Sequence, residues 1–177
     1  KRINPLSNLS SIKVQPYISG SDDITSALNI MKNIYATNGI NLEVESTITL
    51  DNKYSDVSRY FHNILTSEMV SLGDNDKVNL FFINDYTDAG GLFGNAPGIP
   101  GSQGLKGSHN GVLINLSMHK MDGPLDNQLL AETAGHEMGH FLGLFHTTES
   151  NGTDHDPISD TPECSFTTAN QCGKQYG

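Results

Sequence analysis

The sequence of 177 residues has few basic residues, only two cysteines, and no apolar run of the length that a bilayer requires. The last absence argues against a membrane protein, because a spanning helix needs about 20 consecutive apolar residues. Ten Lys and Arg residues against 20 Asp and Glu give a net charge of −10, which repels a phosphate backbone and argues against nucleic-acid binding. A hydrophobic content of 36% suits a soluble chain that folds as one domain over residues 1–177.

The two cysteines, Cys164 and Cys172, lie in a Gly-, Asn- and Thr-rich region and do not form a CxxC metal-binding pair. Their short spacing suits a disulfide in an oxidising compartment. The chain begins at Lys1-Arg2 and shows no basic-then-apolar signal segment. We therefore expect either a cytosolic protein or a mature secreted form, and the disulfide favours the secreted one.

The spacing of apolar residues switches between the period of a strand and that of a helix, which predicts an α/β (α+β) domain. Asp126 or Asn127 can cap the last helix, and Gly143 can end it. Gly and Pro dominate residues 89–111, which predicts an irregular surface segment. The expected strands are 12–18, 40–50, 78–83 and 112–118, and the expected helices are 24–35, 56–72 and 128–142.

The last predicted helix leads into the sequence HEMGHFLGLFH at residues 136–146. His136 and His140 are four residues apart, so on a helix their side chains lie on one face and can bind one metal ion. Glu137 projects beside the first ligand, where it can exchange protons with a metal-bound water without coordinating the ion. This pattern predicts two metal ligands and a general base on a single helix.

Gly143 can adopt the left-handed conformation that turns the chain sharply, so that His146 approaches the same ion as a third ligand. Three imidazoles leave the fourth tetrahedral position for water, which is the catalytic arrangement of zinc. The full pattern HExxHxxGxxH arises by chance in about one of ten thousand chains of this length. The alternative is a pair of surface histidines on an ordinary amphipathic helix.

The extended motif resembles the signature of the metzincin zinc peptidases. Three other segments are similar to the pappalysin (cytophagalysin) family of that clan: Gly98-Ile99-Pro100-Gly101, Gly111-Val112-Leu113-Ile114, and Asp160-Thr161-Pro162 followed by Cys164. The resemblance implies a twisted mixed sheet and two long helices above a horizontal cleft, in an upper lobe of about residues 1–143. It implies an irregular lower lobe over about residues 144–177.

The resemblance also implies that the edge strand before the active-site helix binds substrate antiparallel, here through Gly111, Val112 and Leu113. The alternation of this strand alone suits an ordinary core strand equally well. Metzincins carry a methionine in a turn beneath the metal, yet all five methionines here precede His146. We therefore expect the chain to stop short of that turn and the lower lobe to be incomplete.

An acidic, turn-rich segment contains Asp154, Asp156 and Asp160, whose oxygen atoms are the kind of ligand that calcium prefers. The resemblance implies structural calcium near this segment, and the alternative is a merely solvated acidic loop. The histidines outside the motif are expected to be exposed rather than metal ligands: His62, His109, His119 and His155.

Together these features predict a secreted, monomeric zinc endopeptidase that acts on proteins or peptides, with Glu137 as general base. The acidic balance and the resemblance favour a basic residue just after the scissile bond. Two other functions stay open. The first is a catalytically silent module that keeps the fold to bind peptides, and the second is a zinc hydrolase of a non-peptide amide.

Overall fold

A computed structural model describes residues 10–101, 109–121, 123–147 and 156–157 of the chain. Its elements, in chain order, are β1 (Ser10–Ile18), α1 (Thr25–Thr37), β2 (Ile40–Val44), β3 (Ile48–Thr49), the 3₁₀ turn η1 (Asn52–Tyr54), β4 (Asp56–Val57), α2 (Ile64–Val70), β5 (Val78–Ile83), β6 (Asp85–Tyr86), β7 (Gly94–Asn95), β8 (Val112–Asn115), the 3₁₀ turn η2 (Ser117–His119) and α3 (Asn127–Phe141). No helix among these residues is long and apolar enough to cross a membrane.

The main sheet has six strands, in the order β2-β1-β5-β8-β7, with β3 pairing β1 beyond the end of β2. Every pair is parallel except β7 with β8, which is antiparallel. Pro16 lies in β1 between the stretch that pairs with β2 and the stretch that pairs with β3, so its missing N–H leaves no ladder bond unmade on that side. The predicted mixed sheet of an α/β fold is confirmed.

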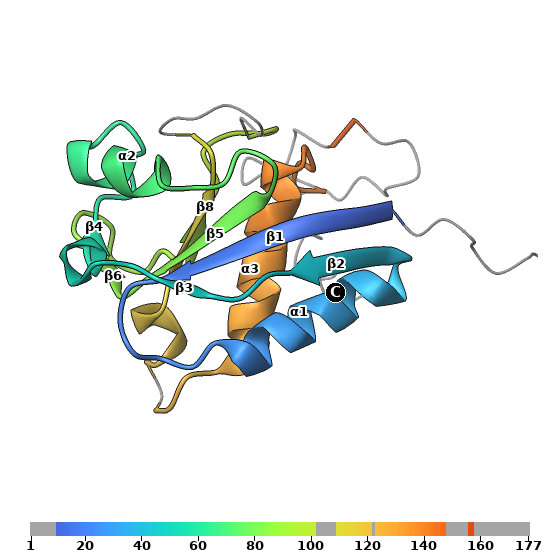
Figure 1. Ribbon diagram of the computed structural model, residues 1–177, viewed down its shortest axis with the longest axis horizontal. Coiled ribbons are helices and arrows are strands. Elements are labelled where there is room, and N and C mark those ends of the chain that lie inside the picture. Colours follow the sequence, from blue (N-terminus) through green and yellow to red (C-terminus); the bar gives the residue numbers. More distant parts are fainter. Residues whose placement is uncertain (1–9, 102–108, 122, 148–155, 158–177) are drawn as a thin grey trace, which may run out of the picture.

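Both faces of the sheet are covered, and β5 shows how. Leu80 and Phe82 pack in one apolar cluster with residues of α1 and α3, whereas Phe81 and Ile83 pack in another cluster with residues of α2 and its flanking segments. All six residues of β5 are buried, as the continuous apolar run of this strand predicts. Figure 1 shows the two long helices, α1 and α3, beside the sheet, and α2, β4 and β6 together at the left of the molecule.

The predicted helix over 56–72 is wrong in its first half. Asp56 and Val57 form β4, which pairs with β6 in a separate two-stranded parallel sheet. The helix α2 begins only after Asn63, whose side-chain oxygen accepts the backbone N–H groups of Leu65 and Thr66. The sequence spacing could not reveal the pairing with β6, because that partner lies almost 30 residues downstream.

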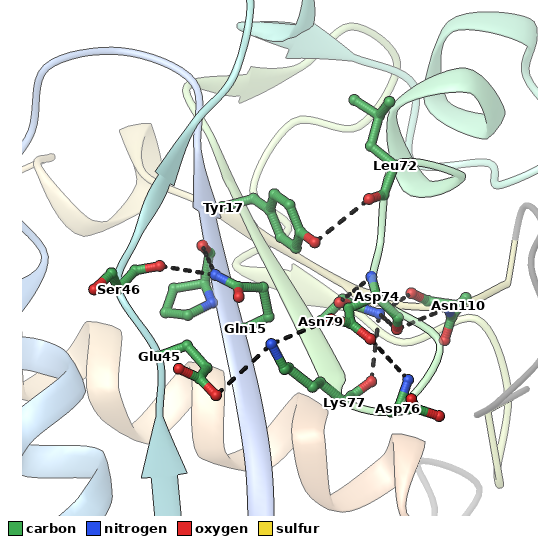
Figure 2. A network of polar contacts seen from close by, with 11 residues as sticks. Gln15, Tyr17, Glu45, Ser46, Leu72, Asp74, Asp76, Lys77, Asn79 and Asn110 are labelled. Carbon is green, nitrogen blue, oxygen red and sulfur yellow. Dashed lines mark hydrogen bonds and ion pairs between the residues drawn. The ribbon is translucent and has the colours of Figure 1, made fainter.

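A polar network joins the segments that enter β5 and β8 (Figure 2). The Asn79 side-chain amide donates to the carbonyl oxygens of Asp74, at 2.8 Å, and of Asn110, at 3.0 Å. The Lys77 ammonium lies 3.1 Å from the Asp74 carboxylate and 3.7 Å from that of Glu45. Because Asn79 is fully buried, these bonds replace the water that its amide loses on folding. They fix the start of β8, the strand that precedes α3 in the chain.

Candidate metal centre

Three imidazole rings meet at the C-terminal end of α3. Asp126 caps this helix, since its carboxylate accepts the backbone N–H groups of Gln128 and Leu129, each at 3.0 Å. His136 and His140 lie one turn apart on one side of the helix, as predicted. Gly143, with φ of +109°, ends the helix, and the chain turns back so that His146 joins the other two rings.

The ring nitrogens that face one another are the Nε2 atoms. They are separated by 2.9 Å for His136 and His140, 3.0 Å for His140 and His146, and 3.2 Å for His136 and His146. Nitrogen ligands bound to zinc at about 2.05 Å in a tetrahedron lie about 3.3 Å from one another. The spacing of the three nitrogens is therefore close to that of a zinc site with three imidazoles.

The protonation pattern supports the same conclusion. The Nδ1 atom of His140 lies 2.7 Å from the carbonyl oxygen of Leu144, which can only accept, so this nitrogen carries the proton and Nε2 presents a lone pair. Burial, followed by the neighbouring His140 and His146, lowers the pKa of His136 and favours its neutral form. Nε2 of His140 can therefore donate its lone pair to a cation, and the other two Nε2 atoms lie close enough to bind the same ion, so the triad fits zinc.

Glu137 projects from the same turn of α3 and is half-buried. Desolvation raises the pKa of its carboxyl group, while His140 and a hydrogen bond from the backbone of Ala96 act in the opposite direction. The carboxylate is held beside the metal ligands by the strand β7. A Cβ atom added to Gly94 of β7 would lie 2.6 Å from Cγ of Glu137, so only glycine leaves room for the glutamate here.

A cavity of about 270 Å³ opens in front of this group. It is bounded by the three histidines and Glu137, and by the segment 92–99, which contains β7. The residues from that segment are Leu92, Gly94, Asn95, Ala96 and Ile99. The cavity therefore offers a ligand both the metal ligands and a strand backbone.

The strand that we expected at the edge of the sheet is not at the edge. The strand β8, with Val112 and Leu113, lies between β5 and β7, and these two residues and Gly111 are buried. A Cβ atom at Gly111 would lie 2.5 Å from the ring of Phe81, which shows how tightly it is packed. The prediction of an edge strand here is therefore wrong, because the short strand β7 pairs with β8 on the side that was expected to be open.

The segment Gly98–Gly101 packs against the end of α3. The backbone N–H of Gly101 donates to the carbonyl of Phe141 at 2.8 Å. A Cβ atom at Gly101 would lie only 2.1 Å from the Phe141 ring. A glycine is thus required for this segment to lie flat on the helix that carries the first two histidines.

Among the other predicted residues, His62 and His109 are exposed, as expected. His119 is not: it is 2% exposed, because both its ring nitrogens find partners inside the protein. Asp154, Asp160, His155 and both cysteines lie outside the described residues, as does most of 144–177. Asp156 is half-buried in the described part. Sequence reasoning missed Gly94, since it is one of several glycines in an irregular stretch and gives no local signal.

Comparisons with known proteins agree with this geometry. No family model matches the chain. The chain is 30% identical over 145 residues to an extracellular metalloprotease of Colletotrichum graminicola, covering 78% of this chain and 49% of that protein. It is 27% identical over 142 residues to extracellular metalloprotease 1 of Coccidioides posadasii, with the same coverage of 78% and 49%. The chain thus spans about half the length of the curated relatives it matches.

The fold comparison covers nearly the whole chain. The crystal structure of the archaemetzincin from Methanopyrus kandleri superposes with a TM-score of 0.52 at 15% sequence identity, covering 98% of this chain and 96% of that one. At that identity the likeness concerns the fold alone. The chain therefore has a metzincin-like fold, and its sequence is similar to those of fungal extracellular metalloproteases.

Proposed function

We propose that this chain carries the catalytic centre of a zinc-dependent endopeptidase. The observation that carries the proposal is the convergence of three Nε2 atoms within 3.2 Å of one another, with the half-buried carboxylate of Glu137 on the same helix. His136, His140 and His146 would hold the ion. The names of the fungal relatives support a metalloprotease in particular.

When bound, zinc supplies a Lewis acid that acidifies water and polarises a carbonyl group. Glu137 accepts the proton of the attacking water and delivers it to the departing amine. Its raised pKa suits this exchange, because a carboxylate that binds a proton more readily is a better base near neutral pH. No serine or cysteine nucleophile takes part, so no acyl-enzyme forms.

The edge strand β7 is the surface on which we place the peptide substrate. Asn115 of β8 donates its backbone N–H to the carbonyl of Phe93 at 2.8 Å. Because the direction of backbone groups alternates along a strand, those of Gly94 point away from β8 and towards the cavity. A peptide that adds to this edge would pair through its own backbone, which gives affinity largely independent of sequence.

The finer assignments rest on resemblance. Gly98-Ile99-Pro100-Gly101 and the segment that begins at Gly111 support the pappalysin family, together with Asp160-Thr161-Pro162. We place the protein outside the cell, as the names of its relatives say of them. The remaining parts of the proposal are a disulfide between Cys164 and Cys172, calcium at Asp154, Asp156 and Asp160, an irregular lower lobe over about 144–177, a monomeric state, and a basic residue after the scissile bond.

The test compares the wild-type protein with Glu137→Gln, which keeps the size of the side chain and removes the base. Both should bind about one zinc ion per chain, measured by mass spectrometry of the metal. Only the wild type should cleave a protein substrate such as casein, and a zinc chelator should stop it. We expect the variant to lose turnover by a factor on the order of 10³ or more.

Three results would contradict the proposal in different ways. Comparable cleavage by zinc-loaded Glu137→Gln would remove Glu137 from its role as the base. A zinc-loaded wild type that binds peptides and cleaves none of a peptide library would indicate the silent binding module. Hydrolysis confined to small non-peptide amides would indicate the other hydrolase.

A further inference from the structure

The turn between β8 and α3 contains a buried histidine that has no part in metal binding. His119 ends the 3₁₀ turn η2 and is 2% exposed. Its ring meets that of Phe93 edge to face, with centroids 5.2 Å apart and planes at 84°. Phe93 directly precedes the edge strand β7, so His119 touches the segment on which the proposed substrate strand depends.

Both ring nitrogens of His119 are engaged. Nδ1 lies 2.6 Å from the carbonyl oxygen of Asn115, and Nε2 lies 2.9 Å from the hydroxyl oxygen of Thr133. A carbonyl can only accept, so Nδ1 carries the proton and Nε2 accepts from the Thr133 hydroxyl. Burial lowers the pKa of His119, which agrees with a neutral ring. The imidazole thus joins the end of β8 to the middle of α3.

Thr133 lies one helical turn before Glu137, on the same side of α3. A Cβ atom at Gly94 would meet Cγ2 of Thr133 at 3.1 Å and Cγ of Glu137 at 2.6 Å. The threonine is therefore held between His119 and the edge strand. Any sideways shift of Thr133 would alter the contact between β7 and the helix at the point where Glu137 projects.

Asn115 completes the connection from the other side. Its backbone N–H donates to the carbonyl of Phe93 at 2.8 Å, and its side-chain amide donates to that of Leu92 at 3.1 Å. Asn115 is fully buried, so these bonds are shielded from water. A chain of contacts thus runs from the lead-in to β7 through Asn115 and His119 to Thr133.

We propose that His119 is a positioning residue that sets the separation between α3 and the edge strand β7, and thereby the place of Glu137 relative to bound peptide. It touches neither the metal ligands nor the cavity in front of them. The inference rests on the proposed function, because it assigns His119 to the geometry of that same site.

The alternative is a purely structural role, in which His119 only fills space in the core. Matched variants separate the two. His119→Leu and Thr133→Val each remove the bond between imidazole and hydroxyl while keeping apolar volume, whereas His119→Gln can still reach Thr133 with its amide. Gln15→Met is the control, because Gln15 lies in β1, three strands away from β7. It removes the side-chain bonds of Gln15 to the carbonyl oxygens of Ser46, at 2.8 Å (Figure 2), and of Pro16, at 3.2 Å.

The experiment measures zinc affinity by chelator competition, kcat and KM on a peptide, and the amide resonances of Gly94 and Ala96. In His119→Leu and Thr133→Val we expect kcat/KM to fall by about tenfold or more, since small misplacements of catalytic groups are costly. Zinc affinity should stay within about threefold, because the bonds of His140 are untouched. In the double variant the fold-loss in kcat/KM should be at most about twice that of either single variant, and not the product of the two, because both substitutions remove the same bond. His119→Gln should recover part of the loss.

The amide resonances of Gly94 and Ala96 should shift in His119→Leu and stay in place in Gln15→Met. Unchanged resonances and an unchanged kcat/KM in both His119→Leu and Thr133→Val would overturn the inference, as would an equal loss in Gln15→Met. A zinc-loaded wild type without peptidase activity would instead overturn the proposed function. The amide resonances would then still decide whether His119 positions β7.

Discussion

Replacing Gly94 by alanine is the smallest change that tests how the site is built. Gly94 lies in β7, and its φ is not in the left-handed region, so alanine introduces no backbone strain. The added methyl group would meet Cγ of Glu137 at 2.6 Å, Cγ2 of Thr133 at 3.1 Å and Cδ of Glu137 at 3.2 Å. The effect of the substitution is therefore confined to the contact between β7 and α3.

The size of the displacement follows from these distances. Carbon atoms in good contact lie about 3.5 to 4.0 Å apart. From 2.6 Å, the Glu137 side chain or the strand must move by about 1 Å to reach such a contact. A misplacement of this size in a catalytic group costs about a hundredfold in rate. We therefore expect kcat/KM of Gly94→Ala to fall by about a hundredfold.

The assay is steady-state cleavage of a fluorogenic peptide by zinc-loaded protein, with zinc content and thermal unfolding measured in parallel. Gly90→Ala is the matched control, because a Cβ atom there meets nothing within 4 Å. It should leave all three quantities unchanged. If Gly94→Ala keeps full activity, the contact between Gly94 and Glu137 does not position the base, and this part of the account is wrong.

Three other predictions concern stability. Gly101→Ala should lower the free energy of unfolding by about 1 to 3 kcal/mol, measured in urea, because the methyl group overlaps the Phe141 ring. Asp126→Ala should cost about 1 kcal/mol in the same assay, since two N–H groups of α3 lose their cap. Burial raises the pKa of Tyr35 from 10.0 to about 12. Because the unfolded chain loses this proton at a lower pH than the folded chain, the free energy of unfolding should fall as the pH rises between these two values. The fall should be larger in the wild type than in Tyr35→Phe.

The sequence predicted the parts of the site that depend on neighbouring residues. His136 and His140 follow from helical spacing, and Gly143 from the conformation that ends a helix. The cap at Asp126 is also local. These features need no knowledge of the rest of the chain, because each involves residues within one or two turns.

The parts that depend on distant pairing could not be predicted. The strand β7 has only two residues, Gly94 and Asn95, and exists because they pair with Ile114 and Leu113 of β8, which come much later in the chain. Without β7, the alternation of β8 suited an edge strand as well as an interior one. His119 was expected to be exposed, and it is buried because two partners from different elements satisfy its ring.

The central claim is that three imidazole nitrogens of this chain hold a zinc ion. X-ray absorption at the zinc edge of the purified protein tests it most directly. We expect one zinc ion per chain with three histidine nitrogens at about 2.0 to 2.1 Å and no sulfur neighbour, a pattern that His146→Ala should lose. A spectrum with sulfur ligands, or one that His146→Ala leaves unchanged, would contradict it.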